Sequence, residues 1–206
     1  MDMIFIALAG LNEEETKAAK SIQMNLMHIQ IGAAGFADTF GLYLHLRGLK
    51  HQGMDSRLNS YWRKIAARNG AIEAYGTWMA MQAVNEARIP TLLHKVNMEK
   101  RKEATKLFTS EFPTVIQLRQ TTAHPGELSS TEAEIETHSL KKPIETSQMS
   151  IGSGNFIADV MESSDTGVIF NASFKGNHVQ YELSEAKAIV LQNVSQLYCQ
   201  AYRPLG

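Results

Sequence analysis

Residues 12–40, NEEETKAAKSIQMNLMHIQIGAAGFADTF, give the strongest helical pattern in the chain. Asn12 followed by Glu15 has the spacing of a capping box, and the acidic residues there suit the positive end of a helix dipole. After them, apolar residues recur every three or four positions, as one helix face requires: Ile22, Leu26, Ile29, Ala33, Phe36 and Phe40. The pattern predicts a long helix that ends in the turn-forming sequence RGLKHQG, residues 47–53.

Three glycines, Gly32, Gly35 and Gly41, lie inside this predicted helix. Glycine weakens a helix because it loses more backbone freedom on folding than other residues. It also lets a neighbouring helix approach closely. The sequence leaves both interpretations open.

Two further helical regions follow along the chain. The first starts after Asp55 or Ser56 and continues to about Arg88, where Pro90 disfavours helix at the residue before it. We interpret its mostly apolar stripe, interrupted by Asn69, as the buried face: Leu58, Trp62, Ile65, Asn69, Ile72, Tyr75, Met79 and Val84. The second spans about Met98 to Ala123, and Pro113 should kink it or split it in two.

The C-terminal third changes character. Residues 125–150 are polar and lack a sustained period, which predicts a mobile loop with a short helical turn around 131–137. Alternation then predicts a β-hairpin over 168–183, with Gly176 and Asn177 in the turn and a third strand within 155–161. Ser184 should cap a last helix closed by Pro204, with these residues on its apolar side: Ile189, Val194, Leu197, Tyr198 and Ala201.

These elements predict a mainly α fold: an antiparallel helical bundle with a small β-hairpin inserted before the last helix, as a single domain over residues 1–206. The 20 basic and 21 acidic residues exclude a global polycation, although a local basic patch fits within a neutral total. The single cysteine, Cys199, excludes an intrachain disulfide and is expected to be a buried small hydrophobe. The apolar start, MDMIFIALAGL, is too short to span a bilayer and lacks a basic leader, so we expect a cytoplasmic protein with no membrane partner.

Most signatures of catalysis are missing from the sequence. The seven histidines form no i, i+4 pair around a glutamate, so no metal site is predicted. Gly152 and Gly154 are not followed by the Gly-Lys-Ser/Thr of a phosphate loop, and no Gly-x-Ser-x-Gly elbow occurs. No cofactor is therefore expected.

Arg119 and His124 are the residues that could carry chemistry, in the stretch VIQLRQTTAHPGEL, residues 115–128. A guanidinium suits a phosphate, and an imidazole moves protons near neutral pH, so the two could cleave RNA without a metal. The spacing itself is not specific, because Arg88 and His94 form a second such pair. The alternative interpretation is a helix C-terminus whose cations suit the helix dipole.

The same stretch resembles the signature of HEPN domains, an all-helical family with many RNA-cleaving members. That signature is an arginine, a polar residue directly after it (here Gln120) and a histidine a few positions further on, near a helix end. The order of helices and the hairpin before the last one are also similar to some relatives. The resemblance implies a homodimer in which the Arg119 and His124 pairs of two subunits face each other across a cleft for single-stranded RNA. A toxin or defence factor controlled by an antitoxin is one role that it implies.

Other polar residues are weaker candidates. Arg68, Asn69 and Glu73 interrupt an apolar stripe and could support the site, bind a small ligand, or form a buried hydrogen-bond network. The run Lys100-Arg101-Lys102 could attract RNA phosphates or be a solvated helix face. We keep a second function open, namely a non-catalytic helical interaction or regulatory protein or an RNA-binding module.

Overall fold

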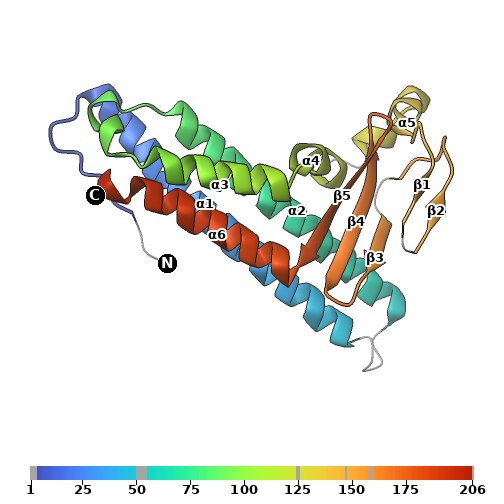
Figure 1. Ribbon diagram of the computed structural model, residues 1–206. Coiled ribbons are helices and arrows are strands. Elements are labelled where there is room, and N and C mark those ends of the chain that lie inside the picture. The colour runs from blue at the N-terminus through green and yellow to red at the C-terminus, as the bar shows by residue number, and fades with distance from the viewer. Residues whose placement is uncertain (1–3, 50–54, 124–125, 147, 158–159, 206) are drawn as a thin grey trace. The chain divides into compact units, whose positions relative to one another are not determined.

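The computed structural model describes residues 4–49, 55–123, 126–146, 148–157 and 160–205. Figure 1 shows the expected mainly α fold, with a small antiparallel sheet directly before the last helix. The helices are α1 Glu13–Leu49, α2 Ser56–Glu86, η2 Pro90–Lys95, α3 Met98–Glu111, α4 Val115–Ala123, η3 Glu127–Ser129, α5 Glu132–His138, α6 Glu185–Tyr202 and η4 Arg203–Leu205. The strands are β1 Ile144–Glu145, β2 Ser150–Ile151, β3 Val160–Ser163, β4 Gly167–Phe174 and β5 Asn177–Ser184.

The predicted helix starts are confirmed by their caps. The side-chain oxygen of Asn12 accepts from the backbone N–H of Glu15 at 2.9 Å, and the Glu15 carboxylate accepts from the N–H of Asn12 at 3.4 Å. This reciprocal pair satisfies donors that the first turn of α1 leaves without partners. Asp55 and Ser184 cap α2 and α6 in the same way, by accepting backbone N–H groups of the first helical turn.

Pro113 splits the third helical region, as predicted. Helix α3 ends at Glu111, and α4 begins at Val115. A proline lacks the N–H that an uninterrupted helix would use, and its ring clashes with the preceding turn.

The chain divides into two compact units. The first comprises residues 1–36, 73–113 and 188–206, in which α3 and α6 lie beside the first part of α1 (Figure 1). Its core includes an aromatic series in which Phe108 stacks on both Trp78 and Phe112, and Phe112 meets Phe36 edge to face. Such arrangements of rings are favourable beyond their buried area.

The second unit comprises residues 37–72 and 114–187. Its sheet has the order β3-β4-β5, with Phe170 paired to Tyr181 and Val168 to Leu183. One face of this sheet is buried and mostly apolar: Val168, Phe170, Ala172, Val179, Tyr181 and Leu183. Helix α4 contacts β4 and β5, and Arg47 of α1 donates to the carbonyl oxygen of Ser164 at 3.0 Å.

The hairpin turn differs by one residue from the prediction. Lys175 and Gly176 are its two central residues, with φ of 50° and 79°, and Asn177 already begins β5. Two residues with positive φ match the twist of the flanking strands, which explains the glycine. The third strand also lies later in the sequence than predicted. It spans Val160–Ser163, whereas the prediction placed it within 155–161.

The stretch expected to be a mobile loop, 125–150, contains regular structure. Thr131 caps α5 by accepting from the backbone N–H of Glu134 at 3.2 Å, close to the predicted helical turn. Ile144 then pairs with Ile151 in the small antiparallel sheet of β1 and β2. The pattern in the sequence is weak here because strands this short show no period.

The predicted buried face of α2 is wrong for most of its length. Of the predicted stripe, Val84 is buried, Ile65 and Tyr75 are half-buried, and the remaining residues are exposed. Apart from Met81 and Val84, the helix buries mainly small residues: Ala66, Ala67, Ala71, Ala74, Thr77 and Ala80. In the first unit the reason lies in α1, where a side chain added at Gly32 would collide with the hydroxyl of Thr77. Helices that approach this closely have room only for small side chains between them. The corresponding prediction for α1 is confirmed, because all six of its predicted core residues are buried.

Candidate functional site

Helix α4 carries the first predicted catalytic residue, Arg119. Val115, Leu118, Thr121 and Thr122 form its buried side, and the hydroxyls of both threonines donate to the carbonyl oxygen of Leu118. Arg119 and Gln120 lie on the remaining side and are half-buried. The short helix is thus anchored by its apolar side while Arg119 stays partly exposed.

The second predicted catalytic residue, His124, lies outside the described residues, as does Pro125. The described part of α4 reaches Ala123, the residue directly before His124 in the sequence.

The supporting residues belong to two units. In the second unit, Arg68 is half-buried, and the amide nitrogen of the exposed Asn69 donates to the hydroxyl of Thr39 at 3.2 Å. In the first unit, the Glu73 carboxylate packs against Gly35 of α1, and desolvation raises its pKa. Asn69 and Glu73 therefore each contact α1, Asn69 from an exposed position and Glu73 from a half-buried one.

The rival pair, Arg88 and His94, lies in the first unit, and both side chains are exposed. His94 belongs to η2, which begins at Pro90. Substitutions of Arg88 and His94 can therefore serve as the control for substitutions of Arg119 and His124.

A basic groove of about 390 Å³ lies in the first unit between α2 and α3. Arg101, Lys102 and Lys106 contribute its charge, and Asn85, Thr105 and Thr109 complete the described lining without a carboxylate. Of the predicted basic run, Lys100 instead donates to the side chain of Gln200 at 2.8 Å, so only part of that run faces the groove.

A polar network that the sequence did not predict lies on the second face of the β3-β4-β5 sheet. Asn171 is fully buried; its amide nitrogen donates to the Glu162 carboxylate at 2.9 Å, and its oxygen lies 2.8 Å from Nε2 of His178. Because the Asn171 oxygen can only accept, His178 carries its proton on Nε2 and its lone pair on Nδ1. Desolvation lowers the pKa of His178, and the charge of Glu162 opposes that shift without cancelling it. The signal in the sequence that could have revealed this network is the polar Asn171 within the mostly apolar strand VIFNASF, residues 168–174.

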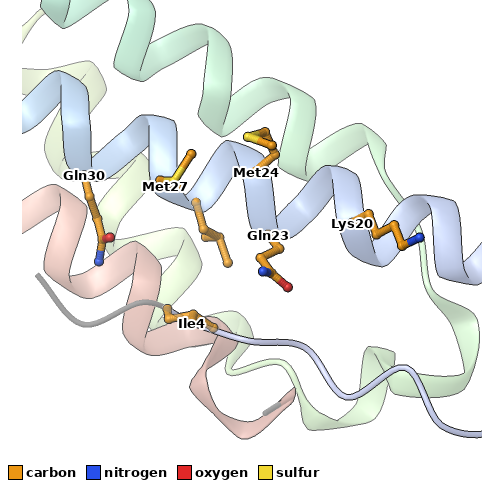
Figure 2. Close-up of a pocket in the computed structure, with 7 residues that line it drawn as sticks. Ile4, Lys20, Gln23, Met24, Met27 and Gln30 are labelled. Atoms are coloured by element: carbon orange, nitrogen blue, oxygen red, sulfur yellow. The ribbon is translucent and has the colours of Figure 1, made fainter.

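A cavity of about 270 Å³ lies in the first unit between α1 and the segment that carries Ile4 (Figure 2). Gln23 and Gln30 point from α1 toward that segment, while Met24 points to the other side of the helix (Figure 2). Lys20 is the one charged residue in its described lining, so the cavity supplies no acid–base pair.

A neighbouring groove of about 410 Å³ reaches Cys199, whose burial raises the pKa of its thiol to about 11. This thiol stays protonated at neutral pH, as expected for a buried hydrophobe.

Comparisons of the chain with protein-family models, with curated proteins and with solved structures find no match. Among the residues that the structure describes, no three His, Cys, Asp or Glu side chains gather as metal ligands. No helix in the described part of the chain is long and apolar enough to cross a membrane.

Proposed function

We propose that this chain is a HEPN-like, metal-independent endoribonuclease that acts as a cytoplasmic homodimer through Arg119 and His124. The observation that carries the proposal is the partly exposed Arg119 on helix α4, whose other side is buried and whose described residues reach Ala123, the neighbour of His124 in the sequence. The basic groove of Arg101, Lys102 and Lys106 supports it, because cations along a groove attract the phosphates of RNA. An RNA-degrading toxin held in check by an antitoxin is a role of this kind.

The chemistry needs two groups. His124 takes the proton from a ribose 2′-OH as its oxygen attacks the adjacent phosphorus, and Arg119 stabilises the negative charge that builds on the phosphate oxygens. The bond from phosphorus to the 5′-oxygen breaks, and that oxygen receives a proton. The products are a 2′,3′-cyclic phosphate and a 5′-hydroxyl.

The test is cleavage of labelled single-stranded RNA by the full chain in EDTA. His124→Ala should lower the rate by about a hundredfold or more, since general acid–base catalysis typically contributes that much. Arg119→Ala should do likewise, and RNA with 2′-deoxyribose at the cut position should stay intact.

The matched control is the double variant Arg88→Ala/His94→Ala, which removes the second Arg/His pair and should leave the rate unchanged. Cleavage by His124→Ala at the wild-type rate would refute the catalytic assignment. Loss of activity in the control variant would show that the wrong pair had been chosen.

A second candidate, a non-catalytic helical interaction or regulatory protein, is favoured by the large apolar side chains that α2 exposes. Monomeric proteins rarely leave an extended apolar surface uncovered. This function predicts no turnover of any RNA by the wild-type chain, whereas binding through α2 persists.

A further inference from the structure

The cavity between α1 and the segment of Ile4 is formed entirely by residues of the first unit. Three apolar side chains, those of Ile4, Leu26 and Met27, contribute to its described lining, and Leu26 is only 2% exposed. Its volume of about 270 Å³ is close to the lower end of the range for pockets that hold small organic ligands. A ligand seated there would remove apolar surface from water, which favours binding.

The cavity is elongated along α1. Figure 2 shows Lys20 and Gln30 at the two ends of the stretch of helix that lines it, with Gln23 between them. An α-helix rises about 1.5 Å per residue, so this stretch is about 15 Å long. A long and mostly apolar space of small volume suits an unbranched hydrocarbon chain better than a wide ring system.

The segment of Ile4 is held over the cavity by its own backbone. The N–H of Ile6 donates to the side-chain oxygen of Gln23 at 3.5 Å, and the N–H of Ala7 donates to the carbonyl oxygen of Leu205 at 2.9 Å. Ile6 is also buried, so packing anchors the segment as well. The walls of the cavity are therefore formed before a ligand binds, which lowers the entropic cost of binding.

The polar groups near one end of the cavity are donors. Lys20 carries the one charge among the described lining residues, none of which is Asp or Glu. Because the side-chain oxygen of Gln23 accepts from Ile6, the NH₂ group of the same amide is what Gln23 can offer a ligand, and it only donates. Lys20 and Gln23 are three residues apart and hence neighbours on the surface of the helix. Together they suit a carboxylate, which accepts from both groups and carries the charge opposite to that of Lys20.

We propose that this cavity binds an unbranched, medium-chain monocarboxylate such as decanoate. The carboxylate lies at Lys20 and Gln23, and the chain extends past Leu26 toward Gln30. The proposal concerns binding alone and does not rest on RNA cleavage, since all residues of the cavity belong to the first unit and Arg119 belongs to the second.

Isothermal titration calorimetry of the full chain with decanoate, below its critical micelle concentration, measures the binding. The wild-type protein should bind one decanoate per chain. Decan-1-ol should bind about fivefold more weakly or less, because it brings no charge to Lys20. Hexanoate should bind at least about tenfold more weakly than decanoate, since each buried methylene group contributes about fourfold to affinity.

Two substitutions separate the roles of charge and space. Lys20→Gln should weaken decanoate about fivefold and leave the affinity for decan-1-ol unchanged, a split that a general loss of structure would not produce. Lys17→Gln is the matched control: Lys17 is an exposed lysine one turn earlier on α1 and outside the described lining, so both affinities should stay within about twofold. Met27→Trp should weaken both ligands at least about tenfold, because the indole takes up space in the cavity.

Several outcomes would overturn the proposal. They are the absence of saturable binding to the wild-type chain, equal affinities for decanoate and decan-1-ol, and equal effects of Lys20→Gln and Lys17→Gln. Unchanged binding by Met27→Trp would show that the ligand lies elsewhere on the molecule. Circular dichroism of each variant verifies that the helices remain, so that lost binding is not mistaken for lost folding.

Discussion

Asn171 shows how much one buried amide can organise around it. Its nitrogen and oxygen contact Glu162 and His178 from the two neighbouring strands, so one residue links three strands on a single face. A buried amide with unmet hydrogen bonds would be costly, and here both ends are used. This network fixes the tautomer of His178 and holds Glu162 close enough to influence the pKa of His178.

We expect the pKa of His178, measured by NMR titration, to lie below 6.5, because burial disfavours the charged imidazole. Glu162→Gln should lower this pKa further, since it removes the negative charge and keeps an oxygen that accepts from Asn171. The remaining imidazole signals serve as internal controls and should not move. A rise of the pKa in Glu162→Gln would contradict the network.

The contact between α1 and α2 in the first unit is governed by small residues. A Cβ at Gly32 would meet the Thr77 hydroxyl and come within 3.1 Å of the carbonyl oxygen of Glu73. At Gly35 it would meet the end of the Glu73 side chain, which can move. Gly41 has nothing within 4 Å of such an atom. The three glycines that looked alike in the sequence therefore have different roles.

Alanine substitutions should separate these roles in thermal or urea unfolding. Gly32→Ala should destabilise the protein by roughly 1–3 kcal/mol, as overpacking does, and Gly35→Ala by less. Gly41→Ala is the matched control and should stabilise by about 0.5–1 kcal/mol, because alanine loses less backbone freedom in a helix. Equal effects at Gly32 and Gly41 would show that close helix approach does not matter here.

At the scale of the whole molecule, ionisation links stability to pH in opposing ways. Thr91 donates from its hydroxyl to the Glu15 carboxylate at 2.5 Å and from its backbone N–H at 3.0 Å, and these bonds lower the pKa of Glu15. Because the pKa values of Glu15 and His178 are lowered on folding, the folded state is more stable at pH values above 4.5 and 6.5, the pKa values of these groups in the unfolded chain, than below them. The raised pKa of Glu73 has the opposite sign: it favours folding at low pH, and its contribution is lost as pH rises.

Stability should therefore fall as pH drops below about 6.5 and fall again below about 4.5, where His178 and then Glu15 take up protons on unfolding. Thr91→Val should lower the melting temperature at pH 7 and flatten the limb below pH 4.5, since the largest contribution to the Glu15 shift is removed. Thr109→Val, at an exposed hydroxyl that bonds only within its own helix α3, is the control. An unchanged acid limb in Thr91→Val would refute the role of this bond.

The amino-acid sequence by itself determined the helix starts, the break at Pro113, the buried face of α1 and the hairpin, because caps, prolines and periodicity act over a few neighbouring residues. Tertiary structure alone decided which face of α2 is buried, since that depends on how closely α1 approaches at Gly32. It also decided that Glu162, Asn171 and His178 meet, because residues on three strands become neighbours only through pairing. Most large residues of α2 thus lie at the surface, although their periodic spacing in the sequence suggested a core.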